Sequence, residues 1–122
     1  LDVLSEEQIG GIAFSPLAQG LLTDRYLKGI PDGSRASKAH GFLRPQHITD
    51  DKLEKVVELN KIAQGRNQSL AQMAIAWLLK DIRVTSVLVG VSSTTQLENC
   101  LGAMNNLIFT EIEIDSINRI LE

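Results

Sequence analysis

Residues 9–20 read IGGIAFSPLAQG, and the predicted fold follows from this stretch. Ile9 to Ser15 is predicted to form a short apolar strand that Pro16 ends. A second run, Val84 to Gly90, is apolar at both even and odd positions, which is typical of a strand in a buried parallel sheet. Two such strands need helices over their faces and further strands at their outer edges. The sequence therefore predicts an α/β fold built on parallel strands.

Helices are predicted around both strands. Leu1 to Gln8 is helix-like, and we expect the pair Gly10-Gly11 to end it. Four more helices begin at side chains that can cap a first turn, namely Thr49 or Asp50, Ser69 with Gln72, Ser93 with Gln96, and Thr110 with Glu113. The last three pairs have the spacing of a capping box. Apolar stripes are expected on two of these helices, formed by Leu70, Met73, Ala74, Trp77 and Leu78 and by Ile114, Ile117, Ile120 and Leu121.

The predicted order is strand, loop, two helices, strand, two helices. No further segment has the pattern of a strand, so the outer edges of the two strands need partners from elsewhere. We expect an N-terminal part that is absent from these 122 residues to supply them. The alternative is that a second copy of the chain supplies them.

Composition narrows the classes of function. The net charge is −3 and the sequence pI is about 5.4, so there is no basic surface for nucleic acid. Lys and Arg residues are scattered, which argues against binding at a membrane surface. No apolar run approaches the roughly 18 residues of a membrane span. The single cysteine, Cys100, excludes an intrachain disulfide and favours a reducing compartment, and we expect a cytoplasmic protein.

The first candidate site follows the first strand. In α/β folds, ligands bind where parallel strands end and their loops begin. Phe14 can offer a flat face to a planar ring, Ser15 offers a hydroxyl, and loop amides near Gly20 can donate to a phosphate. The alternative is an ordinary strand end with a turn formed by Pro16 and Gly20.

The second candidate site follows the second strand, where residues 89–96 read VGVSSTTQ. Hydroxyl groups stand directly before a predicted helix, whose free amides and dipole attract anions. The alternative is that Ser93 is an ordinary helix cap and that Thr94 and Thr95 lie in solvent.

A third feature is a cluster of cationic and polar residues in the irregular stretch 28–46 and just before it, formed by Arg25, Lys28, Ser34, Arg35 and Lys38. Such a loop beside a cleft could hold phosphates, or it could be a solvated loop.

The glycine-rich nucleotide loops and the common metal-binding motifs are absent from the sequence. Cys100 is expected to be a small core residue, and His40 and His47 have no evident metal partner, so no metal site is predicted.

Several separated motifs together resemble the aldo-keto reductase family. They are Ile12–Thr23, Gly29-Ile30-Pro31, Ser34-Arg35, Ala74–Leu79, and Ser86–Ser92 with Gln96-Leu97. The resemblance is closest to the branch that holds L-glyceraldehyde 3-phosphate reductase and the potassium-channel β subunits. It implies that residues 1–122 are the C-terminal part of one (β/α)₈ TIM-barrel domain. Ile9–Ser15 would be strand seven and Val84–Gly90 strand eight.

The resemblance also implies NADP as the cofactor. Phe14 matches the aromatic residue that stacks on nicotinamide. The residues that match the other contacts are Ser15, Pro16, Leu17 and Gly20 for the pyrophosphate, Arg25, Ser34 and Arg35 for the loop that closes over it, and Gly90, Ser92 and Gln96 for the adenosine 2′-phosphate. The family commonly holds adenine with Glu then Asn, where this chain has Asn99 and Cys100, and Asn99 is included among the predicted cofactor-binding residues.

The family's catalytic Asp, Tyr, Lys and His come from earlier strands, and no residue of this chain corresponds to them. The resemblance therefore implies a whole protein that reduces aldehyde or ketone carbonyls, small molecules that are its expected partners. This chain would contribute only cofactor binding and would be inactive by itself. Two alternatives stay open, which are a non-catalytic NADPH-binding regulatory module of the channel β-subunit type and a half-barrel that pairs with itself. No oligomeric state is predicted.

Overall fold

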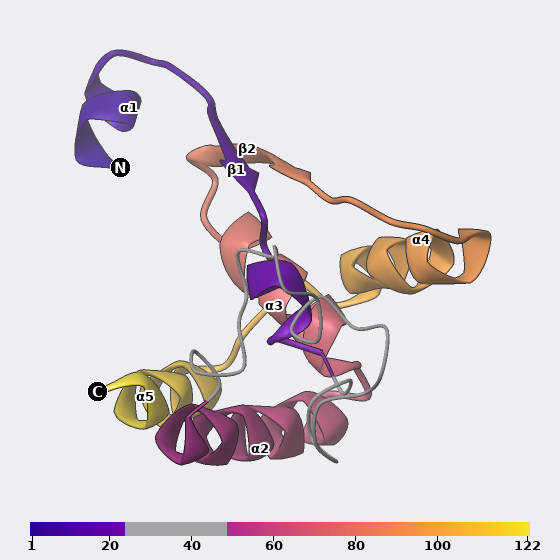
Figure 1. Cartoon of the computed structure of the whole chain (residues 1–122). Coiled ribbons are helices and arrows are strands. Elements are labelled where there is room, and N and C mark those ends of the chain that lie inside the picture. The colour runs from indigo at the N-terminus through magenta and orange to yellow at the C-terminus, as the bar shows by residue number, and fades with distance from the viewer. Residues whose placement is uncertain (24–48) are drawn as a thin grey trace.

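The computed structural model describes residues 1–23 and 49–122. Within these residues the chain forms five α-helices, two 3₁₀ turns and two strands, and Figure 1 shows their arrangement. In order they are α1 (Asp2–Glu6), β1 (Gly11–Phe14), the 3₁₀ turn η1 (Ala18–Gly20), α2 (Asp50–Gly65), α3 (Leu70–Leu79), β2 (Val84–Leu88), α4 (Thr94–Leu101), the 3₁₀ turn η5 (Gly102–Asn105) and α5 (Glu111–Leu121). The predicted order of strands and long helices is confirmed for the described part.

The two strands pair with each other in parallel, as the sequence predicted. Ile12 lies opposite Ser86, and Phe14 lies opposite Leu88. Both strands are shorter than predicted, because the ladder ends at Phe14 and Leu88. In a parallel pair the carboxyl ends lie at the same edge, so the segments that follow β1 and β2 start side by side.

Only one face of this sheet is covered by the described residues. Helix α3 packs against β2, and Ala13 and Val87 are half-buried. On the other face Ile12 is 72% exposed, Phe14 76% and Leu88 65%. The expectation of strands buried on both faces is therefore not met within residues 1–23 and 49–122, since their second covering layer is not among them. The apolar residues on that face still indicate that something covers it.

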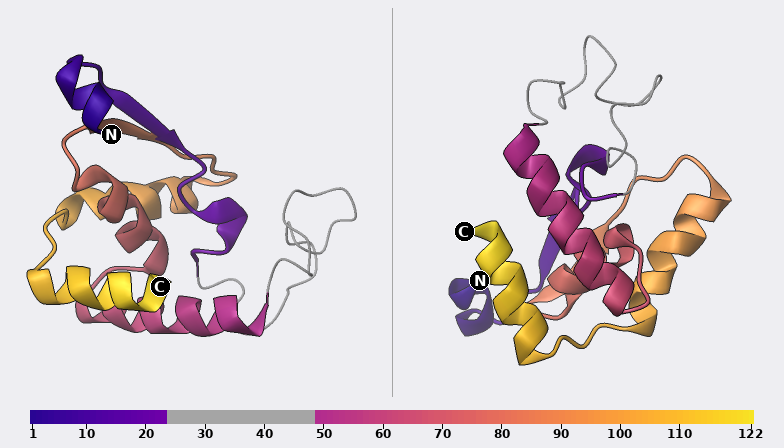
Figure 2. Two further views of the ribbon diagram at one scale, coloured as in Figure 1. Left: turned by 90° about the vertical axis from the view of Figure 1, so that its left-hand side faces the viewer. Right: turned by 90° about the horizontal axis from the view of Figure 1, so that it is seen from below.

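The described core lies between α2, α3 and α5. Figures 1 and 2 show α2 and α5 side by side, with α3 between this pair and the strands. The buried core cluster consists of Val56, Leu59, Ala63, Leu70, Met73 and Ile117. Because α3 has neighbours on two sides, it also buries Ile75 and Ala76, which the predicted stripe omitted. Leu121, predicted to face inward, is exposed at the end of α5.

The predicted helix caps are largely confirmed. Ser69 with Gln72 and Thr110 with Glu113 form complete capping boxes, and the Thr49 hydroxyl accepts the amide of Lys52. Ser93 caps α4 by accepting the Gln96 amide at 3.2 Å, but the Gln96 side chain does not complete the box.

Helix α1 ends earlier than predicted. Its C-cap is Glu7. The residue that ends the helix with a left-handed backbone is Gln8, with φ of 55°, and not the pair Gly10-Gly11 that we expected to end it. The Ile9 amide donates to the Leu4 carbonyl at 2.8 Å, which closes the helix end. Gly10 serves a different purpose, because a Cβ atom there would overlap the Thr85 side chain of the neighbouring strand.

Candidate cofactor-binding site

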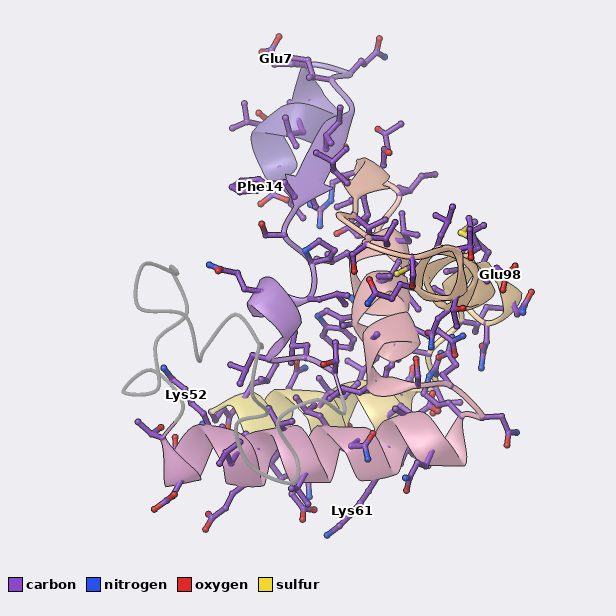
Figure 3. The ribbon with its side chains drawn as sticks, turned by 45° about the vertical axis from the view of Figure 1, so that its right-hand side comes forward. Glu7, Phe14, Lys52, Lys61 and Glu98 are labelled. Carbon is purple, nitrogen blue, oxygen red and sulfur yellow. The ribbon has the colours of Figure 1, made fainter. Side chains whose placement is uncertain are left out.

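Phe14 is the last residue of β1, and its ring projects from the strand into open space (Figure 3). The next residue, Ser15, is also exposed and has a left-handed backbone, with φ of 53°. This turn directs the chain out of the sheet immediately after the aromatic ring. The strand end therefore presents an exposed aromatic ring followed by an exposed hydroxyl group.

The turn that follows β1 is tightly folded. Ala18 and Gln19 have left-handed backbones, with φ of 45° and 60°, and Gly20 has φ of 101°. Left-handed conformations at non-glycine residues cost free energy and often occur at ligand-binding segments. Pro16 and Leu17, which directly precede this turn, are half-buried.

The backbone amides of this turn do not have the arrangement that we expected, in which they are free to donate to a phosphate. The Gly20 amide donates to the Leu17 carbonyl at 2.8 Å, and the Leu21 amide donates to the Ala18 carbonyl at 3.2 Å. These groups are thus engaged within the turn and do not point free toward a phosphate. Gly20 contributes its positive φ, which a residue with a side chain rarely adopts.

The second strand leads to a polar group at the start of α4. The Gln96 side-chain oxygen accepts two hydrogen bonds from Ser92, from the amide at 2.9 Å and from the hydroxyl at 3.1 Å. Residues 90–99 are all exposed, and a Cβ atom at Gly90 would meet nothing within 4 Å. The structure therefore brings Ser92 and Gln96 together beside open space, and it also bears out Ser93 as a helix cap.

Asn99 lies further along α4 and is engaged with another helix. Its side-chain oxygen accepts a hydrogen bond from the Ser69 hydroxyl at 2.9 Å. The sequence indicated Ser69 only as the cap of α3, since nothing in local spacing shows a contact between residues 30 positions apart. The remaining candidates, Arg25, Ser34 and Arg35, lie outside the described residues.

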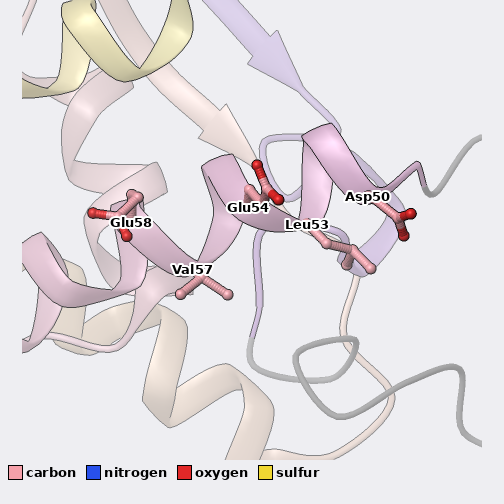
Figure 4. A pocket seen from close by; sticks show the side chains of 5 residues that line it. All are labelled: Asp50, Leu53, Glu54, Val57 and Glu58. Atoms are coloured by element: carbon pink, nitrogen blue, oxygen red, sulfur yellow. The ribbon is translucent and has the colours of Figure 1, made fainter.

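A hollow on the outer face of α2 is chemically unsuited to a phosphate. Its described lining consists of Asp50, Leu53, Glu54, Val57 and Glu58 (Figure 4). Three carboxylates on one helix face repel an anionic ligand. The strand ends, where donors gather without such carboxylates, suit an anionic cofactor better.

Other chemistry is not evident in the described part of the chain. There is no group of three potential metal ligands among residues 1–23 and 49–122. The same residues contain no helix long and apolar enough to cross a membrane.

Cys100 is half-buried, and burial raises the pKa of its thiol, which keeps it protonated and weakly nucleophilic. Its neighbours Leu97 and Leu101 are exposed, so it lies at the margin of the structure and not in the core cluster.

The sequence pattern of the aldo/keto reductase family matches residues 1–122. The chain belongs to the aldo/keto reductase family. The resemblance stated from the motifs is thereby confirmed. The chain is 51% identical over 123 residues to L-glyceraldehyde 3-phosphate reductase of Escherichia coli O157:H7. That match covers 98% of the chain and 35% of the relative, so the chain spans about a third of the relative's length.

Two further comparisons agree. A probable voltage-gated potassium channel subunit beta of Arabidopsis thaliana is 35% identical over 125 residues, covering the whole chain and 38% of that protein. A glycerol dehydrogenase of Gluconobacter oxydans has a similar structure, with a TM-score of 0.75 and 22% identity over 99% of the chain and 36% of its own. This likeness shows the fold alone. The aldo/keto reductase chain is thus an α/β unit that corresponds to part of a TIM barrel.

Proposed function

We propose that this chain supplies the NADP-binding side of an aldo/keto reductase that reduces aldehyde or ketone carbonyls. The observation that carries the proposal is the common edge at which β1 and β2 end, because each strand there leads into a polar segment. Phe14 and Ser15 follow β1, and Ser92 with Gln96 follows β2. The strands act as strands seven and eight of a (β/α)₈ barrel, and the 51% identity to a reductase supports this assignment.

The proposed contacts divide by the part of the cofactor. Phe14 lies against the nicotinamide ring, where its flat exposed face is available. Ser15, Pro16, Leu17 and Gly20 border the pyrophosphate, and Gly90, Ser92 and Gln96 border the adenosine 2′-phosphate. Arg25, Ser34 and Arg35 belong to the proposed set from outside the described residues, and Asn99 belongs to the proposed site on α4 without an assigned contact to the cofactor.

The polar group at the start of α4 fits a phosphate in one specific respect. Both donors of Ser92 already point at a single oxygen, that of Gln96. A phosphate oxygen accepts hydrogen bonds of the same kind, and the space beside Gly90 leaves room for it. Binding would then replace a neutral acceptor by a charged one, which strengthens the hydrogen bonds.

The cofactor supplies the hydride that reduces the carbonyl. This chain's part is to bind and orient the cofactor, since none of its residues corresponds to the family's catalytic Asp, Tyr, Lys and His. The proton donor belongs to another part of the whole protein. The lone cysteine suits a reducing compartment, and we place the protein in the cytoplasm.

The test uses the full-length protein that contains these residues. We expect NADPH to bind with a dissociation constant in the micromolar range or below, and small aldehydes, including a glyceraldehyde phosphate, to be reduced with loss of NADPH absorbance. Absence of NADPH binding would contradict the proposal. The isolated residues 1–122 should show no turnover, and a steady rate from them would show that the catalytic groups are wrongly assigned.

The potassium-channel relative favours a second candidate, a regulatory module that binds NADPH without reducing carbonyls. Binding of NADPH by the full-length protein, with no reduction of any aldehyde in a broad panel, would support this candidate over the first.

The uncovered sheet face formed by Ile12, Phe14 and Leu88 favours a third candidate, a half-barrel that pairs with itself. Sedimentation of residues 1–122 as a dimer would support it.

A further inference from the structure

Helix α4 is tied to the start of α3 through Asn99. The Ser69 hydroxyl donates to the Asn99 side-chain oxygen at 2.9 Å, and the Gln72 side-chain amide donates to the Asn99 backbone carbonyl at 3.0 Å. The two bonds engage both the side chain and the backbone of one residue. They therefore restrain α4 in position as well as in rotation about its axis.

The two partners of Asn99 are already held in place by each other. The Ser69 hydroxyl accepts the Gln72 amide at 3.2 Å, and the Gln72 side-chain oxygen accepts the Ser69 amide at 2.9 Å. This is the capping box of α3, so Ser69 and Gln72 have little freedom to move. A rigid pair of residues thus fixes a third on the neighbouring helix.

The chain also approaches Gln72 closely just after α4. A Cβ atom at Gly102 would overlap the Gln72 side-chain nitrogen, so only glycine permits this approach. By contrast, α4 buries none of its own residues against the described part of the chain. The hydrogen bonds at Asn99 and the contact at Gly102 are consequently important restraints on this helix.

These contacts bear on the cofactor site because α4 begins next to it. Gln96 lies in the first turn of the helix that Asn99 holds near its other end, and Ser92, which binds Gln96, directly precedes the N-cap Ser93. A tilt or rotation of α4 moves Gln96 and the free amides of that turn together. Small displacements of this kind weaken charge-assisted hydrogen bonds to a phosphate, since such bonds depend on direction.

We propose that Asn99 is a positioning residue, which holds α4 on the capping box of α3 and so aligns Ser92 and Gln96 for the 2′-phosphate of NADP. This inference rests on the proposed function. It differs from a direct contact between Asn99 and the adenine ring, because it assigns the effect of Asn99 to its bond with Ser69.

The experiment compares variants of the full-length protein by NADPH and NADH titration and by amide hydrogen exchange of the free protein. Asn99→Ala and Ser69→Ala should each raise the dissociation constant for NADPH about tenfold, with NADH affected less than about threefold. The double variant should be no weaker than either single variant, and Ser69→Thr, which keeps the hydroxyl, should retain the affinity. Hydrogen exchange across residues 94–101 should accelerate in both alanine variants.

Thr110→Ala is the matched control, because it removes the equivalent capping box of α5 without touching α4. It should lower stability as Ser69→Ala does and leave NADPH affinity unchanged. Loss of affinity in Asn99→Ala but not in Ser69→Ala, or additive losses in the double variant, would overturn the proposal in favour of direct contact. Unchanged exchange across 94–101 overturns the restraint itself, whatever the cofactor does. A wild-type protein that binds no NADPH refutes the proposed function, and with it the alignment of Ser92 and Gln96.

Discussion

The guanidinium of Arg66 donates to the carboxylate of Glu113, with 2.8 Å between Nη1 and Oε2, and so joins the end of α2 to the start of α5. The Arg66 side chain is only 2% exposed. Its other donors bind the Gln68 side chain and the carbonyls of Asn106 and Ile108. The same guanidinium lies 3.7 Å above the Phe109 ring. A buried charge is tolerated here because its N–H groups bind four acceptors and the Phe109 ring covers one face of the guanidinium.

Arg66→Ala should lower the free energy of unfolding by about 3 kcal/mol, because it removes one donor each from a partly buried carboxylate and from two carbonyls. Urea denaturation of the full-length protein measures the change. Lys61→Ala is the matched control, since Lys61 forms an exposed ion pair with Glu58 and should change stability by less than about 1 kcal/mol. Equal losses of stability in the two variants would show that the contacts of Arg66 stabilise the fold no more than an exposed ion pair does.

Glu113 should make stability depend on pH. Burial raises the pKa of its carboxyl, but hydrogen bonds from the Thr110 amide and hydroxyl and from Arg66 outweigh burial and lower the pKa below the ordinary value. A carboxyl whose pKa is lowered by folding contributes stability above its ordinary pKa. That contribution is lost as the pH falls through the lower, folded value.

The test compares the wild type with Glu113→Gln in urea between about pH 6 and pH 3. We expect the variant to be less stable near pH 6 and the difference to shrink below about pH 4.3, where the ordinary carboxyl gains its proton. Asp81, whose carboxyl pKa is lowered mainly by its side-chain hydrogen bond with Arg83, titrates in both proteins and cancels from the comparison. A difference that stays constant with pH would contradict the prediction.

Phe14→Ala should weaken NADPH and NADH binding alike by about tenfold, since the nicotinamide ring is common to both and loses its apolar surface. Fluorescence titration of the full-length protein provides the measurement. Phe14→Tyr keeps the ring and should keep the affinity. Ile12→Ala, on the same open face of β1, is the control for a general disturbance of the strand. Similar losses in Phe14→Ala and Ile12→Ala would argue against stacking.

Ser92→Ala should raise the dissociation constant for NADPH about tenfold and leave that for NADH nearly unchanged, because NADH lacks the 2′-phosphate. Thr95→Ala removes an exposed hydroxyl from the same turn and serves as the control. An equal loss for both cofactors would place Ser92 away from the 2′-phosphate.

Much of the local structure could be predicted because its causes lie close together in the chain. Apolar residues at both even and odd positions of residues 84–90 indicated a parallel strand, and the capping boxes at Ser69 and Thr110 join residues three apart. The prediction for Ser93 was incomplete for an equally local reason. The Gln96 side chain accepts its hydrogen bonds from Ser92, one residue before the cap residue Ser93.

The sequence alone determined the parallel pairing and the order of the helices, because periodicity and short-range hydrogen bonds depend on residues close together in the chain, and its motifs determined the family. Only the tertiary structure decided that Asn99 meets Ser69, 30 positions away, and that Arg66 meets Glu113, 47 positions away. Such pairs depend on the angles at which whole helices pack. Many residues set those angles together, and no single spacing in the chain records them.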